Sequence, residues 1–394
     1  MFLRSFAQGL SVLLASAMAT CWAGDQTPLP SAKPWRPDHT VIVVLENLSA
    51  HEATASQHAY GNAPVYGHVN WQYFNALAAK GAQFNNAHFG RTPYGSGVPT
   101  RPSQPNYLYL FSGHHQGVLS SGVANNSLPD EWLPLTSPNL GAAILKTGGS
   151  FASFSESLPY PSWNCATDSA LVACNVGRAL TDYYRRKHNP TINWTDQIQP
   201  NSARGLQGDL AHHVLPISVN LGFEPTQDPA LKRAFRGFIK DAQGHPLAFD
   251  QLPTVSVVIP NEQNDAHSNT ARMADDWLKT NLGAYAQWAL KHNSLLIVTF
   301  DEDGSTDASK GDPYQTGAHR IPLIFYGAGV KPGVVDRRVD HLNVLSTVLW
   351  LHGALESFKA DFRQHHKVVD GSGSEAEKEF QNLLPITDIF AARR

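Results

Sequence analysis

Three nearly continuous apolar runs are the strongest pattern along this chain. Residues 41–45, 255–259 and 295–300 are rich in Val, Ile and Leu and show no regular alternation of apolar and polar positions. Strands of this composition are buried on both faces, which is typical of a parallel sheet. Weaker versions of the pattern predict further strands at 82–89, 150–154 and 321–326.

Segments with apolar residues at helical spacing separate these strands. They predict helices at 71–77, 107–111, 140–145, 273–289 and 342–351. One broad buried face is expected on the fourth helix, formed by Met273, Trp277, Leu278, Leu282, Tyr285, Trp288 and Ala289. Strands that alternate with helices predict an α/β fold with a central, mostly parallel sheet and helices on both faces.

Few signals divide the chain into separate parts. Residues 24–38 are polar and Pro-rich, as expected of an exposed N-terminal arm. Residues 39–394 contain no repeat, coiled coil or clear linker. We therefore expect a single domain there, with an irregular insertion at about 155–245.

Composition and charge narrow the class of protein. The 394 residues are 42% apolar and 16% charged, as in a globular protein. The formal net charge is −3 and Lys and Arg form no stripe, which argues against a nucleic-acid partner. Beyond the N-terminus, no apolar run reaches the roughly 18 residues of a membrane-spanning helix, so no integral membrane segment is expected. The oligomeric state is left open.

The N-terminus has the features of a secretory signal peptide. Arg4 supplies the positive charge, residues 10–19 form the apolar segment, and small residues follow. Cleavage is expected after Ala23 or Ala19. The mature protein would then be secreted or periplasmic.

Cysteine is rare in this chain, and its placement suggests a disulfide. If cleavage removes Cys21, as cleavage after Ala23 would, two cysteines remain, Cys165 and Cys174. In an oxidising compartment, two cysteines separated by a short, loop-like spacer favour a bond with each other.

The stretch RPSQPNYLYLFSG at 101–113 predicts a loop that enters a helix. Pro102 and Pro105 restrict the backbone, and Ser103 stands where an N-cap residue would. The free N–H groups and the dipole at a helix N-terminus both favour an anion, so the Ser103 hydroxyl is placed to receive a phosphate. The alternative is that Ser103 only caps the helix, and this stretch alone leaves both roles open.

Polar clusters follow each of the three buried strands. They are Glu46-Asn47, the segment 264–267 (NDAH) and the segment 301–303 (DED). In open α/β sheets, ligands bind beyond the carboxyl ends of the strands. Carboxylate oxygens bind divalent cations, while amide and imidazole groups stabilise phosphoryl oxygens. The set predicts metal-assisted phosphoryl transfer through a covalent intermediate.

The sequence also resembles a known family. Six segments occur in the order seen in the phosphoesterase family: VIVVLEN, RPSQPNYLYLFSG, RRKHNP, IPNEQNDAH, IVTFDED and VDHLNVLSTV. That family contains secreted bacterial and fungal acid phosphatases and bacterial phospholipases C, and it belongs to the alkaline phosphatase superfamily. The resemblance spans about residues 40–352 and implies an alkaline-phosphatase-like fold.

The resemblance implies a nucleophile and a set of metal ligands. The family's nucleophile falls on Ser103, and its first-strand acid falls on Glu46. The other implied ligands are Asn47, Asp301 and Glu302, together with Ser103 itself. Superfamily members with two zinc ions commonly have an Asp-His pair where this chain has Asp301-Glu302. The ion is therefore left open among Ca, Mg, Mn and Zn, and oxygen ligands favour the harder ions.

The same resemblance implies groups that hold the substrate. His188 and His267 would contact the phosphate or protonate the leaving group. Asn47, Asn106 and Asp265 are the other expected substrate contacts. Asp265 could instead orient His267 or bind metal, and Asn106 could instead fix the local turn.

Other histidines have structural and functional interpretations. His319 could be a late metal ligand, a capping residue or a surface residue, whereas His341 is expected to be structural. His114 and His115 follow a glycine and are expected in a solvated turn, although they could line the mouth of the site.

We predict a secreted, metal-dependent acid phosphatase that acts through phosphoserine on a small phosphate ester or a phosphoinositide. The alternative is a phosphodiesterase of the phospholipase C type, whose members usually carry additional C-terminal β-domains. A non-catalytic carbohydrate-binding protein is the third possibility, but the nine Trp residues are scattered along the chain.

Overall fold

The computed structural model of the chain describes residues 35–51, 64–90, 94, 100–118, 128, 132–158, 184–195, 208–223, 249–304 and 319–391. The expected signal peptide, residues 24–34 of the expected arm and most of the expected insertion lie outside the described residues. Cys165 and Cys174 lie outside them as well. The signal peptide and the disulfide therefore stay predictions.

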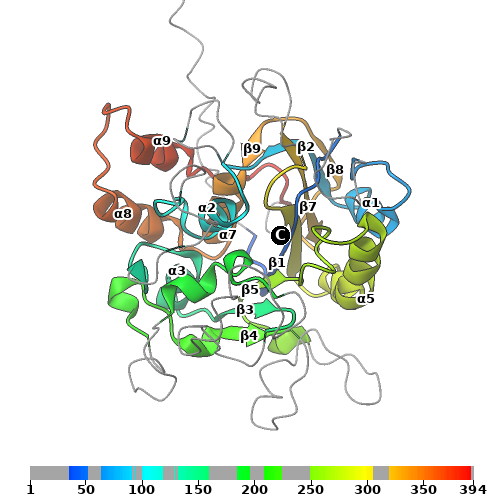
Figure 1. Cartoon of the computed structure of the whole chain (residues 1–394), viewed down its shortest axis with the longest axis horizontal. Coiled ribbons are helices and arrows are strands. Elements are labelled where there is room, and N and C mark those ends of the chain that lie inside the picture. The colour runs from blue at the N-terminus through cyan, green and yellow to red at the C-terminus, as the bar shows by residue number, and fades with distance from the viewer. Residues whose placement is uncertain are drawn as a thin grey trace, which may run out of the picture.

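Nine strands form one sheet at the centre of the described chain (Figure 1). They are β1 (His39–Leu45), β2 (Ala82–His88), β3 (Phe151–Ser155), β4 (Asn220–Gly222), β5 (Val255–Ile259), β6 (Ser294–Phe300), β7 (Arg320–Gly327), β8 (Gly333–Val335) and β9 (Val339–Asp340). Their order is β4-β3-β5-β1-β6-β7-β2-β8, and β9 pairs with β2. All six strands predicted from the apolar pattern are present.

The central strand β1 is parallel to both of its neighbours, β5 and β6. β3 and β4 continue the parallel set, whereas β7 is antiparallel to both β6 and β2. The prediction of a mostly parallel sheet is therefore confirmed. The register pairs Val43 with Val258 and Val298 and pairs Leu45 with Phe300. The carboxyl ends of β5, β1 and β6 consequently lie side by side.

Helices cover both faces of this sheet, as predicted (Figure 1). One face carries α2 (Gln104–Ser112), α3 (Leu140–Lys146), α7 (His341–Leu351), α8 (Leu355–His365) and α9 (Glu375–Asn382), and the other carries α1 (Gln72–Ala78) and α5 (Ala271–Ala289). Short 3-10 helices occur at Arg186–His188 (η4), Thr191–Trp194 (η5), Leu210–His212 (η6), Ile217–Val219 (η7) and Phe249–Gln251 (η8). No helix within the described ranges combines the length and the apolar composition needed to cross a bilayer.

The helix α5 joins the α1 layer through a buried acid. Asp275 accepts the N–H groups of Tyr73 and Phe74, each at 2.8 Å, and so caps α1 from a distant segment. Met273 was predicted to lie on the buried face of α5. This prediction is wrong, because Met273 is 42% exposed. Met273 precedes Leu278 by five residues, which places it roughly 140° around a helix of 3.6 residues per turn.

The prediction of a solvated turn at His114 and His115 is also wrong. α2 ends at Gly113, which has a left-handed φ of 76°. The His114 ring then stacks on His366 of the α8 C-terminus, with ring centroids 4.5 Å apart. His115 is buried and lies 3.3 Å from Oε2 of Glu375. Helices α8 and α9 were not among the predicted elements, and they cover the turn.

A buried histidine, His352, makes the stability of the fold depend on pH. Its Nε2 lies 2.9 Å from Oγ1 of Thr40. Burial, assisted by the nearby charges of Arg36 and His39, lowers the pKa of His352 to about 4. Because an unfolded histidine has a pKa of about 6.5, the unfolded state binds an extra proton between these two values. The folded protein therefore loses stability as the pH falls through this window.

The free energy of unfolding should fall when the pH is lowered from about 7 to 4.5. We predict that this fall is smaller in His352→Gln than in the wild type by roughly 2 kcal/mol. Denaturant unfolding of both proteins at both pH values measures this difference. His212→Gln is the control, because that side chain is 72% exposed, and it should keep the wild-type pH dependence. Equal losses in the wild type and His352→Gln would contradict the assignment.

Candidate active site

Ser103 stands at the N-terminus of α2 but does not cap it. Its backbone is helical (φ −33°, ψ −51°), and its side chain makes no capping hydrogen bond. The hydroxyl instead donates to Oε2 of Glu46 at 3.0 Å, and the residue is only 2% exposed. The sequence left open whether the Ser103 side chain caps the helix or receives a phosphate. The structure shows that it does not cap the helix.

Glu46 is the acceptor around which the neighbouring donors are arranged. Its Oε1 accepts from the Tyr107 hydroxyl at 2.6 Å, and its Oε2 accepts from Nδ2 of Asn47 at 2.8 Å. Nε2 of His188 lies 3.2 Å from Oε1. With Ser103, these groups surround both oxygens of a carboxylate that is fully buried.

Backbone hydrogen bonds fix the cluster to the carboxyl ends of the central strands. The Glu46 N–H donates to the Asp265 carbonyl at 2.8 Å, and the Asp301 N–H donates to the Leu45 carbonyl at 2.9 Å. The Asn47 N–H donates to Oδ1 of Asp301 at 3.1 Å. Asn47 has a positive φ of 57°, a conformation that Asn tolerates better than most residues. This turn directs the chain across the strand ends.

Three buried carboxylates are concentrated at this position. Burial raises the pKa of Glu46 well above its usual value, and the charges of Asp301 and Asp265 raise it further. Burial likewise raises the pKa of Asp265 well above its usual value. It raises the pKa of Asp301 to about 6, although the hydrogen bond from the Asn47 N–H opposes the rise. Such a group is stable only with bound protons or with a cation among the carboxylates.

His188, in η4, lies between two of these carboxylates. Its Nδ1 is 3.6 Å from Oδ2 of Asp265, on the side opposite Glu46. Its ring stacks on Tyr107, with centroids 5.2 Å apart and an interplanar angle of 10°. Burial, with the charge of Lys187 nearby, lowers the pKa of His188 well below its usual value. The imidazole is therefore held neutral, which is the form that binds metal.

The arrangement fits a metal ion. Glu46, His188 and Asp265 each offer a ligand atom, and these atoms all lie within 4.8 Å of one another. Oδ2 of Asp265 and Oδ2 of Asp301 are buried and have no hydrogen-bond partner among the described residues. Buried carboxylate oxygens without donors are costly, and a cation would remove that cost. The expected ligands were mainly carboxylates, whereas His188 would add a nitrogen.

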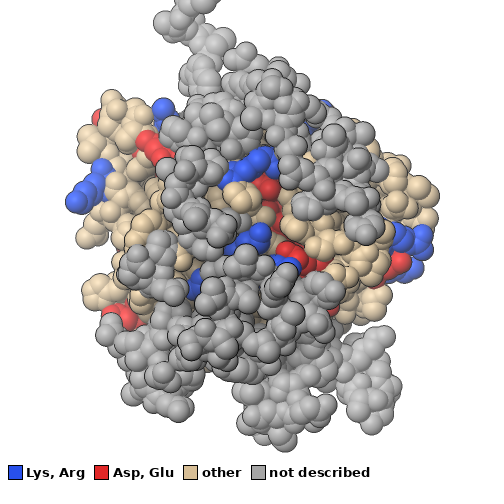
Figure 2. Space-filling model, in the orientation of Figure 1, with Lys and Arg blue, Asp and Glu red and all other residues tan. Residues whose placement is uncertain are grey.

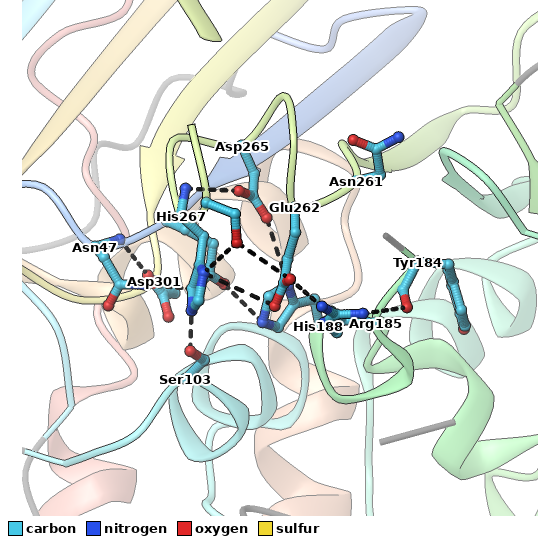
Figure 3. Close-up of polar contacts among 12 residues, drawn as sticks. Asn47, Ser103, Tyr184, Arg185, His188, Asn261, Glu262, Asp265, His267 and Asp301 are labelled. Atoms are coloured by element: carbon cyan, nitrogen blue, oxygen red, sulfur yellow. Dashed lines mark hydrogen bonds and ion pairs between the residues drawn. The ribbon is translucent and has the colours of Figure 1, made fainter. Parts of the chain in front are cut away.

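His267 lies on the same loop as Asp265 (Figure 3). Its backbone N–H donates to Oδ1 of Asp265 at 2.8 Å, so Asp265 positions the backbone of His267. The ring of His267 points toward Ser103, and its centroid lies 6.3 Å from that of His188. The nucleophile candidate and both predicted histidines are thus brought together.

Glu302 and Asn106 lie to one side of this cluster. Nη1 of Arg101 is 3.4 Å from Oε1 of Glu302, and Nδ2 of Asn106 is 3.4 Å from Oε2. The same Asn106 nitrogen donates to the Thr100 carbonyl at 2.9 Å, an interaction that fixes the turn before Ser103. Burial raises the pKa of Glu302 to about 8. Glu302 is therefore contacted by Arg101 and Asn106, and it lies near enough to Asp301 for the charge of that residue to raise its pKa further.

Tyr107 and Arg101 also belong to this region, although neither was predicted to be a site residue. Tyr107 follows Ser103 by four positions, so both lie on one face of α2, and that spacing was the available signal. Arg101 forms an ion pair with Asp303 and lies over the Phe89 ring, 5.1 Å from its centroid. No local pattern in the sequence indicated the pairing of Arg101 with Asp303.

The remaining candidate histidines have defined places. His319 is buried, and its Nδ1 lies 3.2 Å from Oδ2 of Asp303, so a surface role is excluded. His341 contacts the Phe300 carbonyl through Nε2 at 2.9 Å, as expected for a structural residue. Basic and acidic side chains gather at the centre of the face shown in Figure 2, between α2 and α5. This mixed charge suits an anionic ester bound together with a cation.

Comparisons with known proteins point to one chemistry. A family model described as the phosphoesterase family matches residues 225–353. The chain is 32% identical over 346 residues to a phosphatidylinositol-3-phosphatase from Mycobacterium tuberculosis, and the match covers 87% of each chain.

Two similar solved structures are more distant. One is a protein in the alkaline phosphatase superfamily from Vibrio parahaemolyticus (13% identity, 82% of this chain and 68% of that chain, TM-score 0.45). The other is the lipoteichoic acid synthase LtaP from Listeria monocytogenes (9% identity, 89% of this chain and 77% of that chain, TM-score 0.44). Similarity at these TM-scores supports no functional conclusion by itself.

We predict that Tyr107→Phe lowers the free energy of unfolding by roughly 2–3 kcal/mol, because it removes a donor to a buried carboxylate. Denaturant unfolding with a divalent cation present, the condition under which Glu46 is held ionised, measures the loss. Tyr285→Phe is the matched control, since that buried hydroxyl donates to the Leu295 carbonyl at 3.0 Å, and its loss should cost about 1 kcal/mol. A Tyr107→Phe loss no larger than the control would refute the charge-assisted bond.

Proposed function

Because the chain belongs to the phosphoesterase family, we propose that it is a secreted acid phosphatase that hydrolyses phosphate monoesters through a phosphoserine intermediate. Family membership makes it a phosphoric-ester hydrolase. The preference for monoesters, the serine intermediate and the secretion are the further steps of the proposal. Secretion is supported by the signal-like composition of residues 1–23.

The Ser103 hydroxyl is the observation that carries this proposal. It turns away from its own helix and donates to Glu46, a buried carboxylate. Serine becomes a nucleophile when an adjacent base or cation withdraws its proton, and Glu46 is placed to do so. The same position is a helix N-terminus, where the dipole favours the negative charge of a phosphate.

The reaction proceeds in two balanced steps. Oγ of Ser103 bonds to phosphorus as the bond to the alcohol breaks; the serine proton passes to Glu46, and His267 gives a proton to the leaving oxygen. Water then attacks phosphorus and gives a proton to His267 as the bond to Ser103 breaks. Glu46 returns its proton to Ser103, and phosphate leaves.

A divalent cation is part of the proposed active enzyme. Asp301, Asp265 and one oxygen of Glu46 would hold it, while Oε2 of Glu46 stays the acceptor for the Ser103 proton, and Asn47 and His188 lie within reach of the same position. A bound ion supplies positive charge that stabilises the phosphoryl oxygens and lowers the pKa of a nearby hydroxyl. Ca, Mg, Mn and Zn stay candidates, and a nitrogen ligand would favour Mn or Zn over Ca.

A phosphoinositide or another small phosphate monoester is the proposed substrate. The support is the name of the relative from Mycobacterium tuberculosis, a phosphatidylinositol-3-phosphatase. The mixed charge on the face of Figure 2 suits such an anion. A nucleic-acid substrate is disfavoured by the net charge of −3.

Replacement of the nucleophile tests the first part of the proposal. We predict that Ser103→Ala lowers kcat for an aryl phosphate by at least about 1,000-fold and keeps a cooperative unfolding transition. Ser112→Ala is the matched control at the other end of the same helix. Its hydroxyl contacts the carbonyls of Leu108 at 2.8 Å and His114 at 2.9 Å and accepts from Nε2 of Gln116 at 3.0 Å. This control should keep wild-type activity. Full activity of Ser103→Ala would show that another residue attacks phosphorus.

Removal of the metal tests the second part. We predict that dialysis against a chelator abolishes hydrolysis and lowers Tm, and that one of Mn, Mg, Ca or Zn restores both. An ion at 100 times its Kd should stabilise the folded protein by about 2.7 kcal/mol. Asp301→Asn should lose most of this gain in Tm, because it removes one of the charges that holds the ion. A chelated protein with unchanged activity and Tm would rule out a metal-dependent site.

A further inference from the structure

The ring of His267 has a carboxylate partner other than Asp265. Asp265 bonds to the backbone of His267, and its second oxygen faces His188. Nδ1 of the His267 ring lies 3.0 Å from the Ser268 hydroxyl and 3.8 Å from Oε1 of Glu262. The loop IPNEQNDAH thus supplies two acids with different tasks.

The hydrogen bonds around Ser268 determine the tautomer of His267. The Ser268 hydroxyl donates its single hydrogen to Oε2 of Glu262, at 3.3 Å. The Ser268 oxygen can therefore only accept from Nδ1 of His267, which must carry a hydrogen. Nε2 is then the nitrogen on the side of the ring that points toward Ser103 (Figure 3).

Glu262 is itself held by a segment from another part of the chain. Arg185, which precedes η4, forms an ion pair with Oε2 of Glu262 (Figure 3). Both side chains are largely buried, at 12% and 6% exposure, so solvent screens this pair only weakly. Arg185 lies three residues before His188, and one short segment therefore supports both imidazoles of the site.

We propose that Glu262 is a positioning residue for His267, acting through Ser268 and locked by Arg185. The proposal rests on the phosphatase function proposed above. Glu262 and Ser268 keep Nδ1 protonated in every step and stabilise the imidazolium when Nε2 is also protonated. Nε2 then gives its proton to the leaving alkoxide as the bond between phosphorus and oxygen breaks, and later takes a proton from the attacking water.

Leaving-group dependence tests this role. An alkyl phosphate needs a proton on its leaving oxygen, whereas p-nitrophenyl phosphate scarcely does. Because general acid catalysis contributes 100-fold or more, we predict that Glu262→Gln lowers kcat for an alkyl phosphate by roughly 10- to 100-fold, and for the p-nitrophenyl ester by less than about 3-fold. Ser268→Ala keeps the charge of Glu262 but breaks its link to His267. It should therefore also lower kcat more for the alkyl phosphate than for the p-nitrophenyl ester.

Glu156→Gln is the matched control. Glu156 holds the part of the same loop that precedes His267, because it accepts from the Asn261 N–H at 2.9 Å and from Nδ2 of Asn264 at 2.9 Å. Its loss should leave the ratio of the two rates unchanged. Glu262→Gln would have a merely structural effect if it lowered both rates equally, and that result, or no effect on either rate, overturns the proposal.

A measurement independent of activity separates this proposal from the proposed function. Nitrogen-15 NMR of the full chain labelled at histidine, with the His267 signals identified from a His267→Gln variant, reports which ring nitrogen carries the hydrogen. We expect the Nδ1–H tautomer in the wild type and a mixture of tautomers in Ser268→Ala. An Nε2–H tautomer in the wild type overturns the positioning role, whereas the absence of hydrolysis of either ester with this tautomer intact refutes only the phosphatase function.

Discussion

A carboxylate buried at the end of the central strand must obtain polar partners, and Glu46 obtains them from three parts of the chain. Ser103 and Tyr107 donate from one turn of α2, Asn47 donates from the next position along the chain, and His188 of η4 lies 3.2 Å away. Each of these groups is in place only if the sheet, the helix layer and the short 3-10 segment are assembled together. The charge on Glu46 thus links local folding to the shape of the site.

The same arrangement is a compromise between stability and chemistry. Three acids at one sheet edge repel one another, and nothing in the apolar core requires them there. The strands beneath supply the compensation, because β1, β5 and β6 bury apolar side chains on both faces. A cation or a phosphate can then be held by groups that are already oriented, and little reorganisation is needed when the ester reacts.

Backbone geometry explains how residues far apart in the sequence converge. Parallel strands all end at the same edge, so Glu46, Asp265 and Asp301 are neighbours through the register of β5, β1 and β6. The N-terminus of α2 is directed to that edge, where the helical backbone of Ser103 leaves its hydroxyl free for Glu46. The fold therefore brings a serine hydroxyl, a carboxylate acceptor and two imidazoles together at one edge of the sheet.

The sequence by itself determined the strands, most helices and the residue types at the strand ends, because burial on both faces leaves an apolar run that local composition reveals. Ser103, Glu46, His188 and His267 were all identified in this way or by the family resemblance. Only the tertiary structure decided which acid faces which partner: Glu302 pairs with Arg101 and Glu262 faces His267, although neither contact has a local pattern. Such pairings depend on the packing of segments that are distant along the chain, and side-chain periodicity carries no information about that packing.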